Sequence, residues 1–250
     1  MMMTATTQDA GACLVIGAGD ATGGAIARAF AREGLIACVS RRPRHADALE
    51  ALAASIRAEG HDAYALPVDA RDESAITALF DGVEKVIAPL EVVVFNVGAN
   101  VRFDVTETTA QVYRKVWEMA AFAGFLTGRE AAKRMIPRGR GTILFTGATA
   151  SLRGAAGFSA FAGGKHGLRA LAQSMARELG PRNIHVAHVI VDGAIDTEFI
   201  AGLVPDIDAL RAEDAVLSPE AIAENYVWLW KQPRSAWTHE IDLRPWKEKW

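Results

Sequence analysis

Short apolar runs alternate with longer amphipathic stretches from one end of the chain to the other. The runs fall at 13–17, 36–40, 63–68, 92–96, 142–146 and 185–191, with a last one at 239–243. The alanine-rich stretches between them have the apolar spacing of helices and lie at 24–33, 46–59, 73–87, 110–135, 161–179 and 219–230. Strands that are apolar on both faces and alternate with helices predict a parallel sheet covered on both sides.

Right-handed crossovers turn this alternation into a doubly wound α/β sheet of the Rossmann type. No repeat, low-complexity tract or linker interrupts the pattern, so we interpret residues 1–250 as a single domain with a flexible N-terminus at 1–10. In such a sheet the ligand crevice lies outside the carboxyl ends of the strands. Residues directly after each strand are therefore the places to look for function.

Composition and charge exclude several partners. Half of the residues are hydrophobic and the net charge is -3, which gives no electrostatic reason to expect nucleic acid or an anionic membrane. No apolar run reaches the roughly 18 residues of a membrane span, and the first residues lack the pattern of a signal peptide. We therefore expect a cytoplasmic protein. Cys13 and Cys38 fall in predicted strands and are expected to be reduced core thiols, and no cluster has metal-ligand spacing.

The first predicted strand runs into a glycine-rich turn and then into a helix. The turn consists of Gly17, Ala18, Gly19, Asp20, Ala21, Thr22 and Gly23. Glycines permit a tight turn and let backbone N–H groups approach a pyrophosphate at the helix N-terminus, where the helix dipole favours negative charge. With a strand before it and a helix after it, the turn predicts a dinucleotide site.

The end of the second predicted strand distinguishes the two nicotinamide dinucleotides. An NAD site places a carboxylate here for the ribose hydroxyls, whereas an NADP site needs positive charge for the 2′-phosphate. This chain has Ser40, Arg41 and Arg42 and no acid. A guanidinium can grip a phosphate with two donors, and the serine can add a hydrogen bond. The residues favour NADPH over NADH, although a solvated basic loop is the alternative interpretation.

Further motifs follow the other predicted strands in order. They are Asp69-Ala70, Asn96-Val97-Gly98, Phe161 with Lys165 four residues later, and Gly193, Ile195 and Thr197. Together with the glycine turn, they resemble the short-chain dehydrogenase/reductase family over nearly the whole chain. The resemblance implies that Asp69 and Ala70 contact the adenine, that the 96–98 segment passes the adenine ribose, and that 193–197 wraps the nicotinamide. It also implies that Lys165 binds the nicotinamide ribose and that the protein is a homodimer or homotetramer.

The resemblance breaks at the positions that catalyse proton transfer. Family enzymes use a tyrosine, a serine, an asparagine and a lysine, but here Phe161, Ala148 and Ala121 take the first three positions. Only Lys165 is kept, so YxxxK becomes FxxxK. Phenylalanine has no titratable proton and alanine cannot donate to an oxyanion, so ordinary carbonyl reduction should be nearly absent. Asp192 stands at the proline position of the last motif, and is either a replacement acid or base or a turn residue that bonds nearby backbone.

Two functions stay open at this point. One is an NADP-dependent oxidoreductase with a non-standard site that reduces an activated C=C bond or a carbonyl. The other is a catalytically inactive NADP-binding sensor or scaffold. Arg102 and Arg153 follow the fourth and fifth predicted strands, and they either bind an anionic substrate or are solvated loop residues. The aromatic and charged segment 237–250 is either a subunit contact or packs on its own domain.

Overall fold

The computed structural model describes residues 10–19, 21–202 and 206–248. Within them, seven parallel strands form one sheet in the order β3-β2-β1-β4-β5-β6-β7. The strands are β1 (Ala12–Ile16), β2 (Ile36–Ser40), β3 (Ala63–Ala65), β4 (Leu90–Phe95), β5 (Thr142–Thr146), β6 (His185–Val191) and β7 (Glu240–Leu243). The order reverses between β1 and β4, so the predicted doubly wound parallel sheet is confirmed.

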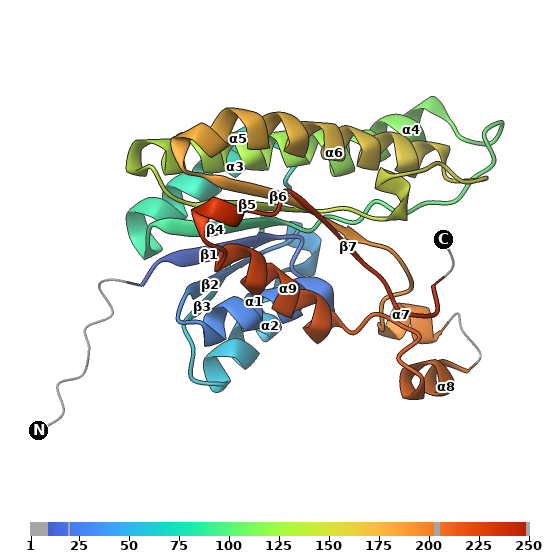
Figure 1. The fold of residues 1–250 in the computed structure, drawn as a ribbon, viewed down its shortest axis with the longest axis horizontal. Coiled ribbons are helices and arrows are strands. Elements are labelled where there is room, and N and C mark those ends of the chain that lie inside the picture. The colour runs from blue at the N-terminus through green and yellow to red at the C-terminus, as the bar shows by residue number, and fades with distance from the viewer. Residues whose placement is uncertain (1–9, 20, 203–205, 249–250) are drawn as a thin grey trace, which may run out of the picture.

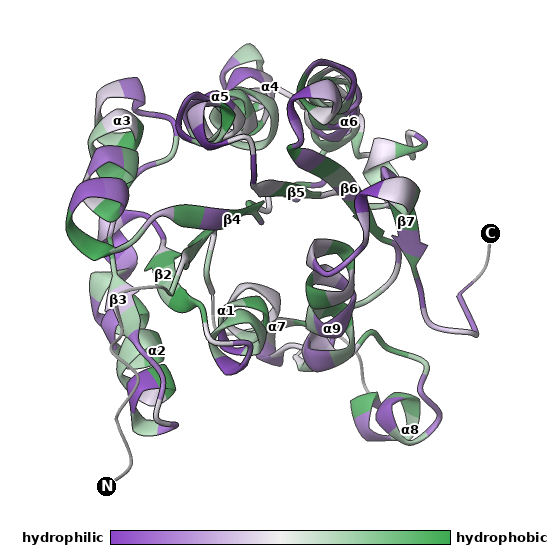
Figure 2. Cartoon of the chain, turned by 60° about the vertical axis from the view of Figure 1, so that its left-hand side comes forward, coloured by the Kyte–Doolittle hydropathy of each residue, from purple (hydrophilic) through white to green (hydrophobic). Residues whose placement is uncertain are grey.

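Two layers of helices cover the sheet (Figures 1 and 2). Figure 1 shows α3, α4, α5 and α6 above the sheet and α1, α2 and α9 below it. The bounds of the helices are α1 (Thr22–Arg32), α2 (Ala46–Ala58), α3 (Glu73–Gly82), α4 (Ala110–Trp117), α5 (Ala123–Met135), α6 (Ser159–Leu179), α7 (Glu198–Ala201), α8 (Ile207–Ala212) and α9 (Pro219–Trp230). The pattern did not predict the short helices α7 and α8, and Figure 2 shows α8 outside both layers.

The strict alternation of side chains along each strand creates two hydrophobic cores. In β1, Cys13 and Val15 point toward the layer of α1, α2 and α9, whereas Leu14 and Ile16 point toward the layer of α3, α5 and α6. All four side chains are almost fully buried. Because both faces of a parallel strand are covered, the strand has no polar side, as the sequence indicated. Cys13 and the equally buried Cys38 are free thiols, as predicted, and burial raises the pKa of Cys38 to about 12.

Several elements differ at their ends from the sequence prediction. The predicted strand 63–68 stops at Ala65, although Leu66 and Val68 still donate backbone hydrogen bonds to the β2 side. The predicted helices 73–87 and 110–135 contain π-helical turns at Val83–Ile87 and Glu118–Phe122. A π turn accommodates an extra residue without breaking the helix, so apolar spacing cannot locate it. In the part of the chain that the structure describes, no helix is long and apolar enough to cross a membrane.

Candidate active site

The glycine turn lies between β1 and α1, at the point where the strand order reverses. The backbone N–H groups of Gly17 and Ala18 both donate to the carbonyl oxygen of Ser40, over 2.8 and 3.0 Å. The side-chain amide of Asn96, which follows β4, donates to the Gly17 carbonyl over 3.2 Å. Gly17 has a φ of 89°, and a Cβ on it would lie 2.5 Å from the backbone oxygen of Asn96. Only glycine fits this position, so the ends of β2 and β4 hold the turn in one conformation.

A first cavity of about 270 Å³ opens beyond β2 and β3. Its lining includes Gly17, Gly19, Arg41, Arg42, Asp69, Ala70, Arg71, Asn96, Val97, Gly98 and Met119. Asp69 accepts two hydrogen bonds from the Arg71 guanidinium, over 3.0 and 2.6 Å, and these hold the pKa of its carboxyl below the usual value. Burial and the neighbouring cations Arg44 and Arg71 lower the pKa of Arg42. Arg71 pairs with the acid, and Arg41 and Arg42 place two further guanidinium groups at this end of the cavity.

A second cavity of about 780 Å³ continues past the N-terminus of α1. Its lining includes Gly17, Gly19, Ala21, Thr22, Gly23, Arg28, Asp196, Thr197 and Arg211. In the described residues no side chain caps the start of α1, which leaves its first N–H groups facing the cavity with the positive end of the helix dipole. Asp20 lies outside the described residues.

A third cavity of about 510 Å³ lies at the ends of β4, β5 and β6. Its lining includes Thr22, Asn96, Gly98, Asn100, Ala148, Thr149, Arg153, Phe158, Phe161, Lys165, Gly193 and Ile195. Lys165 is almost fully buried, and its ammonium donates to the carbonyl oxygens of Thr146 and Val97 over 2.8 and 3.2 Å. Removal of the ammonium from water lowers its pKa to about 8. The cavity therefore holds a lysine that loses its proton more readily than a solvent-exposed lysine does.

Phe161 and Ala148 line this cavity together with Lys165, but Ala121 does not. Ala121 is buried in the π turn between α4 and α5, where its methyl group faces Gly167 of α6. The Phe161 ring stands one helical turn before Lys165, and its centre is 6.0 Å from the lysine Nζ. The structure thus brings the phenylalanine, the alanine and the lysine to one cavity and places the second alanine outside its lining.

The hydroxyl groups near the fifth strand already have partners. Thr146 bonds the hydroxyl of the buried Tyr226 over 2.7 Å, and Ser151 accepts from the backbone N–H of Ala148 over 3.1 Å. Thr149 lines the third cavity and donates to one carboxylate oxygen of Asp192. Its Oγ1 therefore offers an acceptor, rather than a donor, to anything in the cavity.

The surroundings of Asp192 differ from both expectations, which were a replacement acid or base and a turn residue that bonds nearby backbone. It is buried outside the lining of the third cavity, and its second carboxylate oxygen lies 3.0 Å from Arg244. The backbone N–H of Asp192 donates to the carbonyl of Leu243, because β7 runs beside β6 and both strands end at the same level. The aspartate is therefore an ion-pair partner of an arginine from the C-terminal segment, and it reaches the cavity only through Thr149.

Other predicted site residues act through their backbone or cap an element. The Ser40 side chain is buried with no hydrogen-bond partner in the described residues, and its carbonyl oxygen supports the glycine turn instead. Ile195 pairs with Leu217, and the Thr197 hydroxyl caps α7. Trp237 stacks on His185, so this part of the C-terminal segment packs on its own sheet. The sequence did not predict that four further residues lie at the site, because their positions depend on which loops meet. Three of them line the cavities and one pairs with Asp192; they are Arg71, Asn100, Arg211 and Arg244.

A family model for the short chain dehydrogenases matches residues 12–208. The chain belongs to the short-chain dehydrogenase family. It is 48% identical to a short-chain dehydrogenase from Rhodopseudomonas palustris, whose crystal structure has a TM-score of 0.81 and covers 94% of this chain and 99% of that chain.

Two further proteins resemble this chain. An uncharacterized oxidoreductase of Bacillus subtilis strain 168, YxjF, is 30% identical over 79% of this chain and 76% of its own. An actinorhodin polyketide ketoreductase, solved with NADPH, has a TM-score of 0.86 at 24% identity and covers 97% of this chain and 98% of that chain. The first likeness agrees with an oxidoreductase of the short-chain dehydrogenase type, and the second extends to the fold alone.

Proposed function

We propose that this oxidoreductase uses NADP and has a non-standard active site. The observation that carries the proposal is the continuous row of three cavities along the strand ends. The first and second share the glycine turn and Arg41, and the second and third share Thr22 and Asn96. A row with cations at one end, helix N–H groups in the middle and a buried lysine at the other end suits an extended dinucleotide.

In this proposal the adenosine part occupies the first cavity, with Arg41 and Arg42 at the 2′-phosphate and Asp69, Ala70 and 96–98 around the adenine and its ribose. Gly17, Gly19, Asp20, Ala21, Thr22 and Gly23 hold the pyrophosphate. Lys165, Gly193, Ile195 and Thr197 hold the nicotinamide half, which supplies a hydride when it is bound. Ser40 contributes through its carbonyl oxygen, which fixes the turn. The ketoreductase with NADPH, and a metagenomic short-chain oxidoreductase in complex with NADP, support the choice of cofactor at the level of the fold.

The chemistry in the third cavity departs from tyrosine-dependent catalysis. Phe161, Ala148 and Ala121 stand at the tyrosine, serine and asparagine positions, so none of them can give a proton to a carbonyl oxygen. Asp192 is held by Thr149 and Arg244, so we assign it the role of positioning Thr149 rather than that of an acid. Hydride transfer with a proton from water then favours an activated C=C bond or a reactive carbonyl as the substrate.

The same three residues favour a second function, an inactive NADP-binding sensor or scaffold. A turnover screen separates the two: NADPH oxidation is followed with enones, enoyl thioesters, ketones and aldehydes. The enzyme proposal predicts oxidation above background with at least one class. Tight binding of NADPH with no oxidation in any class would instead support the sensor.

We extend the proposal to the organisation of the protein. The expectations are one domain over residues 1–250, a homodimer or homotetramer, and a small-molecule substrate in the cytoplasm rather than nucleic acid or a membrane. Light scattering on the purified chain measures its mass in solution. A monomer at micromolar concentration would contradict the expected assembly.

A further inference from the structure

The third cavity has an unusual balance of charge. Of its described lining residues, Lys165 and Arg153 are the cations, and none is an aspartate or a glutamate. Asp192, which follows β6 nearby, lies outside this lining and forms an ion pair with Arg244, which also pairs with Asp242. Within the described residues Arg153 forms no ion pair with a carboxylate, although ion pairs are frequent elsewhere on this surface. A cavity with a positive charge and no acid attracts an anion.

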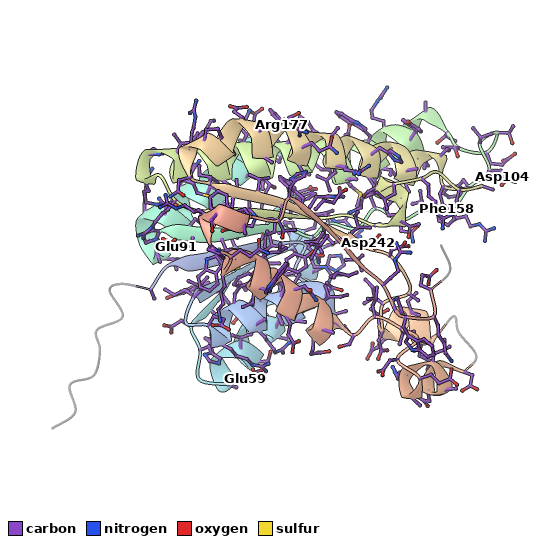
Figure 3. The ribbon with its side chains drawn as sticks, viewed as in Figure 1. Glu59, Glu91, Asp104, Phe158, Arg177 and Asp242 are labelled. Atoms are coloured by element: carbon purple, nitrogen blue, oxygen red, sulfur yellow. The ribbon has the colours of Figure 1, made fainter. Side chains whose placement is uncertain are left out.

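A second arginine stands at the edge of the same cavity. The Arg102 guanidinium lies 5.9 Å from the centre of the Phe158 ring, and Phe158 lines the cavity. The backbone N–H of Phe103 donates to the carbonyl of Gly157 over 2.9 Å and ties the two loops together. Figure 3 shows Phe158 beside the projecting loop, with Asp104 at that loop's outer end. Arg153 therefore lines the cavity, and Arg102 lies beside its Phe158 on a loop that is bonded to the loop of Arg153.

Apolar side chains make up much of the lining of this cavity. They belong to Ala148, Ala150, Ala155, Phe158 and Phe161, and the lining also includes the amide of Asn100. A guanidinium binds a carboxylate or a phosphate with two parallel hydrogen bonds, and an amide N–H can add a third. The arrangement suits a molecule with a reducible group at the inner end, an apolar middle and an anionic group at the entrance.

From this geometry we infer that the substrate is a small anionic molecule, an oxo acid or an oxo phosphate, whose charge binds Arg153 and Arg102. The inference rests on the proposed function for its reducible end. Bound NADPH would supply a hydride to the carbonyl carbon, a hydronium ion of the solvent would supply the proton to the oxygen, and the products would be NADP⁺, water and a hydroxy acid or hydroxy phosphate. The arginines set the substrate's position and take no part in the proton transfer.

The test measures binding, so it does not depend on turnover. Levulinate and its uncharged methyl ester are titrated calorimetrically into the NADP-loaded protein, and dihydroxyacetone phosphate is compared with dihydroxyacetone. A charge-assisted hydrogen-bond pair predicts that an anion binds about tenfold or more tightly than its neutral partner. Tighter binding of levulinate than of its ester would identify the anionic group of the substrate as a carboxylate. Tighter binding of dihydroxyacetone phosphate than of dihydroxyacetone would identify it as a phosphate.

The variants Arg153→Gln and Arg102→Gln should reduce the preference, and the double variant should abolish it. Arg177→Gln is the matched control, because Arg177 is an exposed arginine of α6 outside the cavity (Figure 3) and, among the described residues, its guanidinium bonds the carbonyl of Gln173 in its own helix. The control should keep the full preference. Equal binding of anion and neutral partner, no binding of either anion, or a preference that survives the double variant would overturn the inference. A failed turnover screen with an intact preference would contradict the proposed enzyme and not the anion site.

Discussion

The strongest test of the non-standard chemistry is to restore the missing groups. The double variant Phe161→Tyr and Ala148→Ser places a phenol and a hydroxyl in the third cavity, next to Lys165. The Phe161 ring lines the cavity, and its centre is 6.0 Å from the lysine Nζ. At about 6 Å and an effective dielectric constant near 20, an ammonium stabilises a phenolate by about 3 kcal/mol, or about two pKa units. The introduced phenol would therefore become a proton donor suited to near-neutral pH.

The expected gain follows from what each group supplies. A positioned general acid contributes ~10²–10⁴ in rate and an oxyanion donor ~10²–10³. We expect a gain of at least ~10² in kcat/KM for ketone reduction, with NADPH affinity unchanged. The assay follows the loss of NADPH absorbance with a panel of ketones. Phe158→Tyr is the matched control, because it adds a phenol to the same cavity on the side of Arg102 and should give no gain.

One result would refute this reasoning. If the double variant folds, binds NADPH as the parent does and reduces no ketone faster than the control, the missing groups are not what limits the reaction. The positions of Phe161 and Ala148 would then carry no catalytic meaning, and the sensor function would gain support.

The remaining predictions concern the cofactor end and the fold. Because the pKa of Lys165 is about 8, its ammonium donates below that pH and is lost above it. The affinity of the parent protein for NADPH should thus fall as the pH rises from about 7 to about 9. The Lys165→Met variant should bind NADPH weakly, with an affinity that does not change over this pH range. The same dependence of affinity on pH in the parent and the variant would contradict this prediction. In the Gly17→Ala variant the alanine would be strained at positive φ, and its Cβ would clash with Asn96. We expect the free energy of unfolding, measured by urea denaturation, to fall by ~1–3 kcal/mol. Most of the NADPH binding, measured by calorimetry, should also be lost. Tyr226→Phe leaves the buried Thr146 hydroxyl without its partner and should cost about 1 kcal/mol without changing NADPH affinity; unchanged stability would contradict it.

The parts of the molecule that depend on local pattern were predictable from the sequence. The glycine turn is one such part, because a strand, glycines with a steric role and a helix are consecutive in the chain. The positive charge after β2 is another, since Arg41 and Arg42 follow the strand directly. The spacing of Phe161 and Lys165 on one helix placed both in the same cavity.

The parts that depend on which distant segments meet were not predictable. Asp192 acquires Arg244 because β7 pairs with β6, and no local signal indicates that pairing. Ser40 was expected to offer its hydroxyl, but the final residue of a central strand faces the core and only its backbone is available. Ala121 lies in a π turn outside the lining of the cavity, and apolar spacing does not reveal such a turn.

The central claim is that the row of cavities binds NADP in preference to NAD through Arg41 and Arg42. The most direct measurement is calorimetric titration of NADPH and NADH into the parent chain and into an Arg41→Ala, Arg42→Ala double variant. We predict that the parent binds NADPH at least about tenfold more tightly, as charge-assisted bonds to the 2′-phosphate require, and that the variant loses this difference while its NADH affinity stays the same. Equal affinity of the parent for the two cofactors, or tighter binding of NADH, would contradict the claim.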